Sequence, residues 1–243
     1  MSTFIERRTM ESFVREIMLI GEDNFSKIKN SKVLIFGVGG VGGYVCEALA
    51  RSGVGHFMLV DHDTVSVSNI NRQIIALHST IGRHKVDVMK ERILDINPDC
   101  VVEVKKMFYL PENQDEIHFE EYDYIIDCID TITAKLNIIE RAHELKIPLI
   151  SSMGAGNRLD PTKIQVCDLF DTSYDALAKV MRRELKKRKI YKCKVVCSKE
   201  LARKPLVTIE DEHRRSTPGS SAFVPSCFGL VIASEVMKDL MNR

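Results

Sequence analysis

The sequence lacks any hydrophobic run long enough to cross a membrane. No apolar stretch in its 243 residues approaches the roughly 20 that a membrane helix needs. Residues 1–15 mix Glu and Arg and contain no apolar core of the kind found in secretory signals. We therefore expect a cytoplasmic protein that makes no contact with a membrane, and its length suits a single domain.

Paired cysteines are also missing. The seven cysteines are an odd number, and the closest two, Cys193 and Cys197, have three residues between them and no second pair nearby. In a chain without a secretion signal, this pattern indicates reduced thiols rather than disulfides. A zinc site with four cysteine ligands is disfavoured for the same reason.

Net charge is close to zero, but the positive charge is concentrated in one segment. The 35 Lys and Arg residues against 34 Asp and Glu give a formal charge of +1. Residues 179–192 carry +7, because Glu184 is their one acidic residue and the basic ones are Lys179, Arg182, Arg183, Lys186, Lys187, Arg188, Lys189 and Lys192. Such a cluster suits the phosphates of a nucleic acid, although a solvated helix face would also carry it.

Strand and helix patterns alternate along most of the chain. Apolar and β-branched runs predict strands at 32–36, 56–61, 101–107, 124–127, 148–152, 163–169 and 195–198. Helical patterns occupy 44–51, 85–96, 133–145, 175–188 and 222–241, the last interrupted near Gly229. This order predicts an α/β fold, a doubly wound, Rossmann-like and mostly parallel sheet with a C-terminal extension. We expect one domain over 1–243, with a basic helical segment at about 175–192.

The first βαβ unit carries a glycine motif. Gly37, Gly39 and Gly42 fit G-x-G-x-x-G directly after the first predicted strand. Such glycines allow a tight turn and leave the N–H groups at a helix start available to a phosphate. Asp61, 19 residues beyond Gly42, ends the second strand and is placed to accept from a ribose hydroxyl. A nicotinamide dehydrogenase would show the same features.

The next residues favour a nucleoside triphosphate over a dinucleotide. Arg72 and Lys85 lie within 25 residues of Asp61, and extra cations suit the leaving pyrophosphate of a triphosphate. Asp127 ends the predicted strand at 124–127 and Asp130 comes three residues later, at the carboxyl end of the strand, where ligands of such folds bind. We expect Asp130 to hold Mg²⁺, whereas Asp127 suits a metal or a turn equally well.

Together these residues resemble the ThiF/MoeB/HesA family of ATP-dependent, ubiquitin-activating-type adenylating enzymes. The resemblance runs from Arg15 to near the end of the chain. The motifs that carry it are Gly37-x-Gly39-Gly40-x-Gly42, Asp61-x-Asp63, Ser68-Asn69-x-Asn71-Arg72-Gln73, Gly82-x-x-Lys85 and Asp127-x-x-Asp130.

The resemblance implies an ATP site with Mg²⁺ and assigns its contacts by position. The implied nucleotide-binding residues are Gly37, Gly39, Gly40, Gly42, Asp61, Asp63, Asn69, Arg72, Gln73 and Lys85. Within this set Asp61 would hold the ribose, and Asn69, Arg72 and Lys85 would contact the phosphates. Asp130 would hold the magnesium ion and is implied, with Arg72 and Lys85, to be catalytic.

Arg15 is the fourth implied catalytic residue. It matches by position the arginine that family members send into the site of a dimer partner, so the resemblance implies a homodimer. An ordinary surface arginine on a helix would look the same in the sequence.

Departures from the common family pattern point to one branch. Sulfur-carrier adenylating enzymes usually carry two C-x-x-C pairs, and this chain has none. Residues 154–166, the basic segment, 195–200 and 219–226 are similar to the branch that dehydrates threonylcarbamoyladenosine, the modified adenosine next to the anticodon of tRNA. The alternative is adenylation of the C-terminus of a small sulfur-carrier protein, and a sulfur-relay partner stays open.

Overall fold

The computed structural model of the chain describes residues 2–207 and 218–243, with side chains from residue 11 onward. Its centre is a seven-stranded sheet in the order β3-β2-β1-β4-β5-β7-β6. Six strands are parallel, and β6 runs antiparallel to β7 at one edge. The strands are β1 Lys32–Phe36, β2 His56–Val60, β3 Val101–Lys105, β4 Tyr124–Asp127, β5 Leu149–Ser152, β6 Ile164–Asp168 and β7 Lys194–Ser198.

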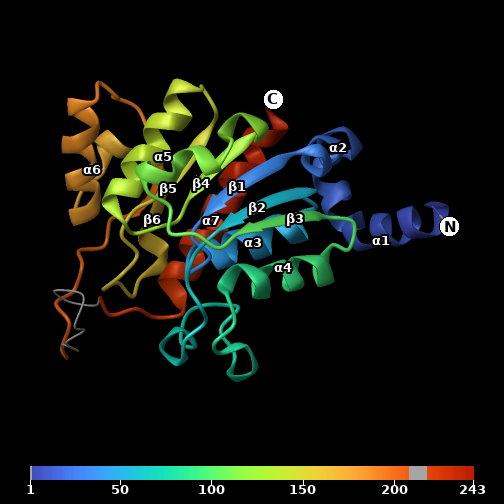
Figure 1. The fold of residues 1–243 in the computed structure, drawn as a ribbon, viewed down its shortest axis with the longest axis horizontal. Coiled ribbons are helices and arrows are strands. Elements are labelled where there is room, and N and C mark those ends of the chain that lie inside the picture. Colours follow the sequence, from blue (N-terminus) through green and yellow to red (C-terminus); the bar gives the residue numbers. More distant parts are fainter. Residues whose placement is uncertain (1, 208–217) are drawn as a thin grey trace.

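Helices cover both faces of this sheet (Figure 1). They are α1 Ser2–Ile20, α2 Glu22–Asn30, α3 Gly42–Arg51, α4 Lys85–Ile96, α5 Ile132–Glu144, α6 Ala176–Lys187 and α7 Phe223–Met241. Helices α3, α4 and α7 share the largest hydrophobic core on one face, and α5 and α6 pack over two smaller cores on the other. The predicted doubly wound, Rossmann-like and mostly parallel sheet is therefore confirmed.

The topology places a crevice between β1 and β4. The chain leaves β1 toward β2 and β3 on one side, and continues from β4 toward β5 on the other. At such a reversal of strand order, the loops after neighbouring strands diverge and leave room for a ligand at the carboxyl ends. This is where the glycine motif and Asp130 follow their strands.

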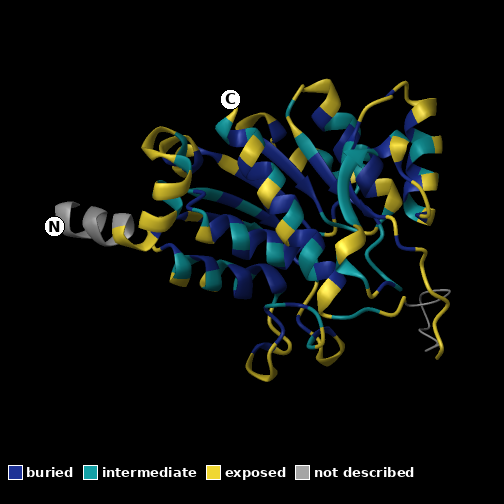
Figure 2. Cartoon of the chain, turned by 180° about the vertical axis from the view of Figure 1, so that it is seen from behind, coloured by how far each residue is buried: buried dark blue, intermediate teal, exposed yellow. Residues whose placement is uncertain are grey.

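The C-terminal part continues the sheet rather than forming a separate appendage. Strand β7 pairs with β5 and β6 pairs with β7, so the extension adds the last two strands of one edge. Figure 2 shows the inner strands mostly buried, with the exposed residues gathered on the outer faces of the helices and the surface loops; the edge strand β6 has intermediate exposure throughout. No helix in the described ranges is both long and apolar enough to span a bilayer.

The expected interruption of the last helix near Gly229 is wrong. Helix α7 runs unbroken from Phe223 to Met241, and Gly229 lies where it crosses α3. A β-carbon at Gly229 would lie 2.5 Å from the Val41 carbonyl oxygen and 2.7 Å from the Tyr44 β-carbon. The glycine therefore permits close packing of two helices and breaks neither.

The sequence patterns did not indicate the first two helices. Of residues 11–20 in α1, only Phe13 is buried, and its ring packs on Phe25 of α2 with a centroid separation of 5.5 Å. Helix α2 is nine residues long and buries Phe25 and Ile28. With so few buried positions, neither segment shows a clear helical period.

We expect Gly229→Ala to destabilise the protein by about 1–3 kcal/mol, because the added methyl group collides with the backbone of α3. The change acts against helix propensity, which favours alanine by about 1 kcal/mol. Ser234→Ala, at an exposed position of the same helix, should change stability by less than about 0.5 kcal/mol. Urea unfolding of both variants measures the difference. A Gly229→Ala protein as stable as wild type would contradict this packing.

Candidate functional site

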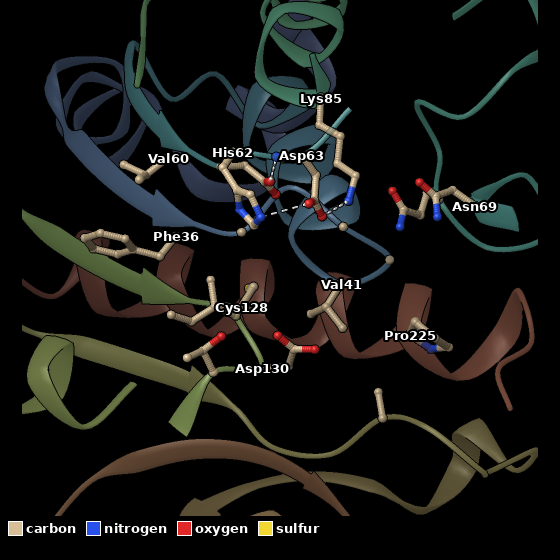
Figure 3. Close-up of a pocket in the computed structure, with 18 of the residues that line it drawn as sticks. Phe36, Val41, Val60, His62, Asp63, Asn69, Lys85, Cys128, Asp130 and Pro225 are labelled. Carbon is tan, nitrogen blue, oxygen red and sulfur yellow. Dashed lines mark hydrogen bonds and ion pairs between the residues drawn. The ribbon is translucent and has the colours of Figure 1, made fainter. Parts of the chain in front are cut away.

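A cavity of about 450 Å³ opens at the carboxyl ends of β1, β2 and β4. Figure 3 shows side chains from these strands and from the loops after them pointing into it. The fold brings most of the predicted nucleotide-site residues to its wall, namely Gly37, Gly39, Gly40, Asp61, Asp63, Asn69, Arg72, Gln73, Lys85 and Asp130.

The turn between β1 and α3 is built for glycine. Gly37 has a φ of +87°, and a β-carbon there would lie 3.0 Å from the carbonyl carbon and oxygen of Cys128. At Gly42 a β-carbon would lie 1.8 Å from the Gly37 carbonyl oxygen. Gly42 does not line the cavity, so its observed part is to let α3 begin against this turn. Gly39 has nothing closer than 3.9 Å to such an atom and leaves the backbone open to a ligand.

Asp61 joins the glycine turn to the end of β2. Its Oδ2 accepts a hydrogen bond from the Val38 N–H at 2.7 Å, and its Oδ1 accepts from the Asp63 N–H at 2.9 Å. The carboxylate thus holds the turn in place while it lies at the cavity wall. Each oxygen keeps a second lone pair that a sugar hydroxyl can use.

Lys85 is a buried cation at the start of α4. It is 5% exposed, and its Nζ lies 2.7 Å from Oδ2 of Asp63. The other oxygen of Asp63 lies 3.1 Å from Nε2 of His62, whose ring meets Phe108 edge-on at 4.6 Å. The dashed lines in Figure 3 follow this chain of contacts across the cavity wall.

Asp61, His62 and Asp63 bring three potential metal-ligating atoms within 4.8 Å of one another. The carboxylates already accept from two backbone N–H groups and from Lys85. This arrangement favours positioning of side chains over chelation of an ion.

Two further residues give the cavity donors and an unsatisfied acceptor. Nη1 of Arg72 donates to the Ser68 carbonyl oxygen at 2.8 Å and to the side chain of Asn71 at 2.9 Å, and burial lowers the pKa of Arg72. Gln73 is buried, and its Oε1 has no hydrogen-bond partner among the described residues. An orphaned acceptor in a cavity wall suits a donor from a bound molecule.

The structure separates the two aspartates after β4. Asp127 is completely buried and forms an ion pair of 2.8 Å with Lys135, which is equally buried. It also accepts from the Ser151 hydroxyl at 2.6 Å, while Lys135 Nζ donates to the Ile129 carbonyl oxygen at 3.0 Å. Asp127 therefore fixes the turn from inside, and Asp130 is the one of the two that lines the cavity.

Arg15 does not join this constellation. It is exposed on α1, which projects from the side of the molecule opposite the loops that follow the strands (Figure 1). Within one copy of the chain it therefore lies apart from the cavity.

Several wall residues were missed by sequence reasoning. Phe108, Ala155, Gly156 and Pro218 line the cavity but come from loops, where no periodic pattern marks a residue. His62 is the middle residue of the Asp61-x-Asp63 motif, and the sequence indicated no role for it. The one sequence signal for Ala155 and Gly156 was their similarity to one branch of the family.

Cys128, the thiol that lines the cavity, and two thiols farther from it are poorly suited to act as nucleophiles. Burial is the main cause that raises the pKa of Cys128, which lines the cavity. It also raises the pKa of Cys167 and of Cys193 to about 12. Cys197 is 1% exposed and its Sγ lies 3.5 Å from that of Cys167. Because the thiolate is the reactive form, Cys128, Cys167 and Cys193 are inert near neutral pH.

Comparisons with known proteins agree with this geometry. The model of the ThiF family matches residues 13–243. A tRNA threonylcarbamoyladenosine dehydratase of Bacillus subtilis is 44% identical over 96% of this chain and 96% of its own length. Crystal structures of the Escherichia coli tRNA N6-threonylcarbamoyladenosine dehydratase in complex with AMP and with ATP superpose with TM-scores of 0.87 and 0.85. Each is 36% identical, over 96% of this chain and 95% of the other.

We expect Lys135→Met to destabilise the protein by about 3–5 kcal/mol, because it leaves the buried carboxylate of Asp127 without its cation. Asp127→Asn should also destabilise, and the double variant should cost about 1–3 kcal/mol less than the sum of the two. Lys238→Met, which breaks the exposed pair with Glu235, is the control and should cost less than about 1 kcal/mol. Chemical unfolding of wild type and the four variants measures these differences. Additive losses would show that the ion pair contributes no coupling.

Proposed function

The chain belongs to the ThiF family, and from this premise we propose that it is an ATP-dependent enzyme that dehydrates threonylcarbamoyladenosine in tRNA. The observation that carries the proposal is the 44% identity to the Bacillus subtilis dehydratase over nearly the full length of both chains. The cavity at the β1–β4 crevice supports it, because its wall combines a glycine turn, a buried lysine, a half-buried arginine and carboxylates.

ATP occupies the cavity in this proposal. The N–H groups around Gly39 and the start of α3 meet the phosphates, and Asp61 accepts from a ribose hydroxyl. Arg72 and Lys85 balance the charge that develops on the departing pyrophosphate. Asn69 and Gln73 lie beside them, and the unsatisfied Oε1 of Gln73 accepts a hydrogen bond from the nucleotide.

The reaction has two steps. First, a carboxylate oxygen of the threonylcarbamoyl group attacks the α-phosphorus of ATP, and the bond to pyrophosphate breaks. Second, a nitrogen of the same group attacks the activated carbonyl carbon. The new C–N bond closes a ring, the C–O bond to AMP breaks, and the nitrogen gives up its proton. The oxygen lost as water leaves in AMP. Since the nitrogen belongs to the substrate, proximity is built in and no protein thiol is required.

The site also fits Mg²⁺, which would supply charge neutralisation to the phosphates when bound. Magnesium commonly takes one or two carboxylates together with substrate phosphates and water. Asp130 supplies such a carboxylate at the cavity wall, whereas Asp127 is occupied by Lys135. We assign the metal to Asp130.

Asp130→Asn should lower ATP cleavage by about 100-fold or more, because the amide keeps the shape of the carboxylate but loses its charge. Released pyrophosphate measures the rate, and thermal unfolding of the protein without nucleotide should be unchanged. Asp115→Asn removes a carboxylate that is exposed and does not line the cavity, and should cleave ATP at the wild-type rate. Full activity of Asp130→Asn would remove the metal assignment.

The basic segment is proposed to hold tRNA phosphates, but its cations are not equivalent. Arg183 and Lys187 pair with Glu184, and Arg188 pairs with Glu140. Arg182 is half-buried and donates to the loop before α6. Among the described residues, the exposed cations of this segment that form no ion pair are Lys179, Lys186, Lys189 and Lys192.

Replacing Lys186, Lys189 and Lys192 together by alanine should weaken tRNA binding and leave ATP affinity unchanged. Removing one phosphate interaction flattens the log–log dependence of affinity on salt by about 0.7–0.9, so the triple variant should lower the slope by about 2–3. The control variant replaces three lysines outside this segment, Lys29, Lys32 and Lys106, by alanine. Its dependence of tRNA affinity on salt should match that of wild type. Equal slopes for the triple variant and wild type would make the segment a solvated surface.

The homodimer that the resemblance implies is also part of this proposal. Val14, Met18 and Leu19 are exposed on α1 beside Arg15, and such apolar residues suit burial against a second copy of the chain. We therefore assign a homodimer in which Arg15 enters the partner's site. In this proposal the protein is a single adenylating domain that acts on its tRNA in the cytoplasm. A sulfur-relay partner stays an expectation.

One experiment tests the function directly. The protein is incubated with ATP, Mg²⁺ and threonylcarbamoylated tRNA, and the nucleosides are then released and weighed. A modified adenosine lighter by one water, formed only with ATP present, is the expected product. An unchanged nucleoside, in a preparation that activates the C-terminus of a sulfur-carrier protein, would replace this function by the alternative.

A further inference from the structure

Tyr174 is an exposed aromatic residue held in an unfavourable backbone conformation. Its φ is +58°, a region that costs bulky L-residues about 1–2 kcal/mol and that glycine or asparagine occupies more easily. The residue is 66% exposed. Its ring makes no aromatic contact with the described residues. Within the described part of the chain, no aromatic packing of Tyr174 compensates for this unfavourable backbone conformation.

A buried ion pair keeps the backbone at this position in place. Arg158 and Asp175 are both nearly inaccessible, with 3.6 Å between Nη1 and Oδ2. Nη2 of Arg158 donates to the Tyr174 carbonyl oxygen at 3.2 Å. Oδ1 of Asp175 accepts from the Ala178 N–H at 2.9 Å and caps α6. The tyrosine is thus held between a buried arginine and the first turn of a helix.

The same pair connects Tyr174 to the nucleotide cavity. Oδ2 of Asp175 accepts from the Gly154 N–H at 3.0 Å, and Arg158 donates to the Gly154 carbonyl oxygen. The next two residues, Ala155 and Gly156, line the cavity. Tyr174 therefore stands beside the loop that forms one wall of the site.

Helix α6 leads from this point to the unpaired lysines. It begins beside Gly154, at the carboxyl edge of the sheet, and its end is tied by Arg188 to Glu140 of α5. The lysines at 186, 189 and 192 lie at the end of α6 and in the loop before Lys194, the first residue of β7. They are therefore on the side of the sheet where the parallel strands begin. A 12-residue helix is about 18 Å long. A strand of nucleic acid from the cavity to these cations would pass Tyr174 first.

We propose that Tyr174 is a stacking platform for an unpaired base of the tRNA, next to the nucleotide that reacts in the cavity. The inference rests on the proposed function, in which the substrate nucleoside lies next to the anticodon. Bases in such single-stranded loops are unstacked and commonly lie on aromatic side chains. The exposed Lys179 in the first turn of α6 and the lysines at the far end of this helix match phosphates farther along the strand.

The test separates the ring from the backbone. Tyr174→Gly removes the ring and relieves the positive φ, so the protein should unfold at the same temperature as wild type or higher. Affinity for threonylcarbamoylated tRNA should fall about 5-fold to 100-fold, the effect of losing one base–aromatic stack. Tyr174→Asn, which also tolerates this conformation, should behave alike, and Tyr174→Phe should bind within about 2-fold of wild type.

Salt dependence and an exposed apolar residue elsewhere provide the controls. Stacking involves no counterion, so the plot of log affinity against log salt for Tyr174→Gly should be parallel to that of wild type and displaced to weaker binding, unlike those of the lysine variants. Val101 is also exposed but begins β3, the strand at the end of the sheet farthest from β6, and Val101→Ala should bind tRNA as wild type does. The affinity for ATP should be the same in all variants.

The outcomes are distinguishable. If wild type dehydrates the tRNA and Tyr174→Gly binds it equally well, the stacking role is overturned and the proposed function stands. Parallel losses of thermal stability and ATP affinity in both Tyr174→Gly and Tyr174→Asn would make Tyr174 a structural residue. If wild type neither binds nor dehydrates the tRNA, the proposed function fails and the stacking role fails with it.

Discussion

The contact between the β1–α3 turn and the end of β4 is the constraint around which the site is arranged. Gly37 lies against the backbone of Cys128, and Gly42 lies against the carbonyl oxygen of Gly37, both too closely for a side chain. Because backbone meets backbone here, the start of α3 faces the crevice at the reversal of strand order. Asp61 fastens the turn to β2 through the Val38 N–H. A ligand bound at this point touches main chain on one side and the ends of three strands on the other.

Two buried ion pairs fix the loops on the far side of the same cavity. Asp127 and Lys135 hold the turn that carries Asp130, while Arg158 and Asp175 hold the loop that carries Ala155. Burying a charge is costly, and replacing such pairs by apolar residues often leaves stability unchanged or improves it. The pairs act here by positioning loops. Each loop buries few apolar side chains of its own, and the hydrogen bonds of the charged pair fix its direction. The fold itself thus positions the loops of the cavity wall through these two pairs.

Sequence patterns predicted the strands and most helices because buried faces impose a period, and they predicted the glycine turn because its spacing follows from backbone geometry. They failed for residues whose role depends on a contact with another element of the fold. Gly229 suggested a break, yet it serves the crossing with α3. Asp127 suited a metal or a turn equally well in the sequence, and its buried ion pair with Lys135 decides for the turn. Arg188 counted toward the positive charge of its segment in the sequence, but Glu140 of α5 pairs with it in the fold. Pairings of this kind depend on three-dimensional neighbours, which one sequence does not reveal.

The crossing of α7 over α3 has a consequence for biosynthesis. The apolar side of α3 is covered by a helix that starts 172 residues after α3 ends, and Lys27 donates to the carbonyl oxygens of Met241 and Arg243 at the end of the chain. At about 5–20 residues per second, a ribosome needs roughly 10–30 s to make the intervening segment. During that time the nucleotide-binding half has its strands but lacks its cover. The cover over α3 can therefore form only after α7 has left the ribosome, and a contact of such long range makes this step slow.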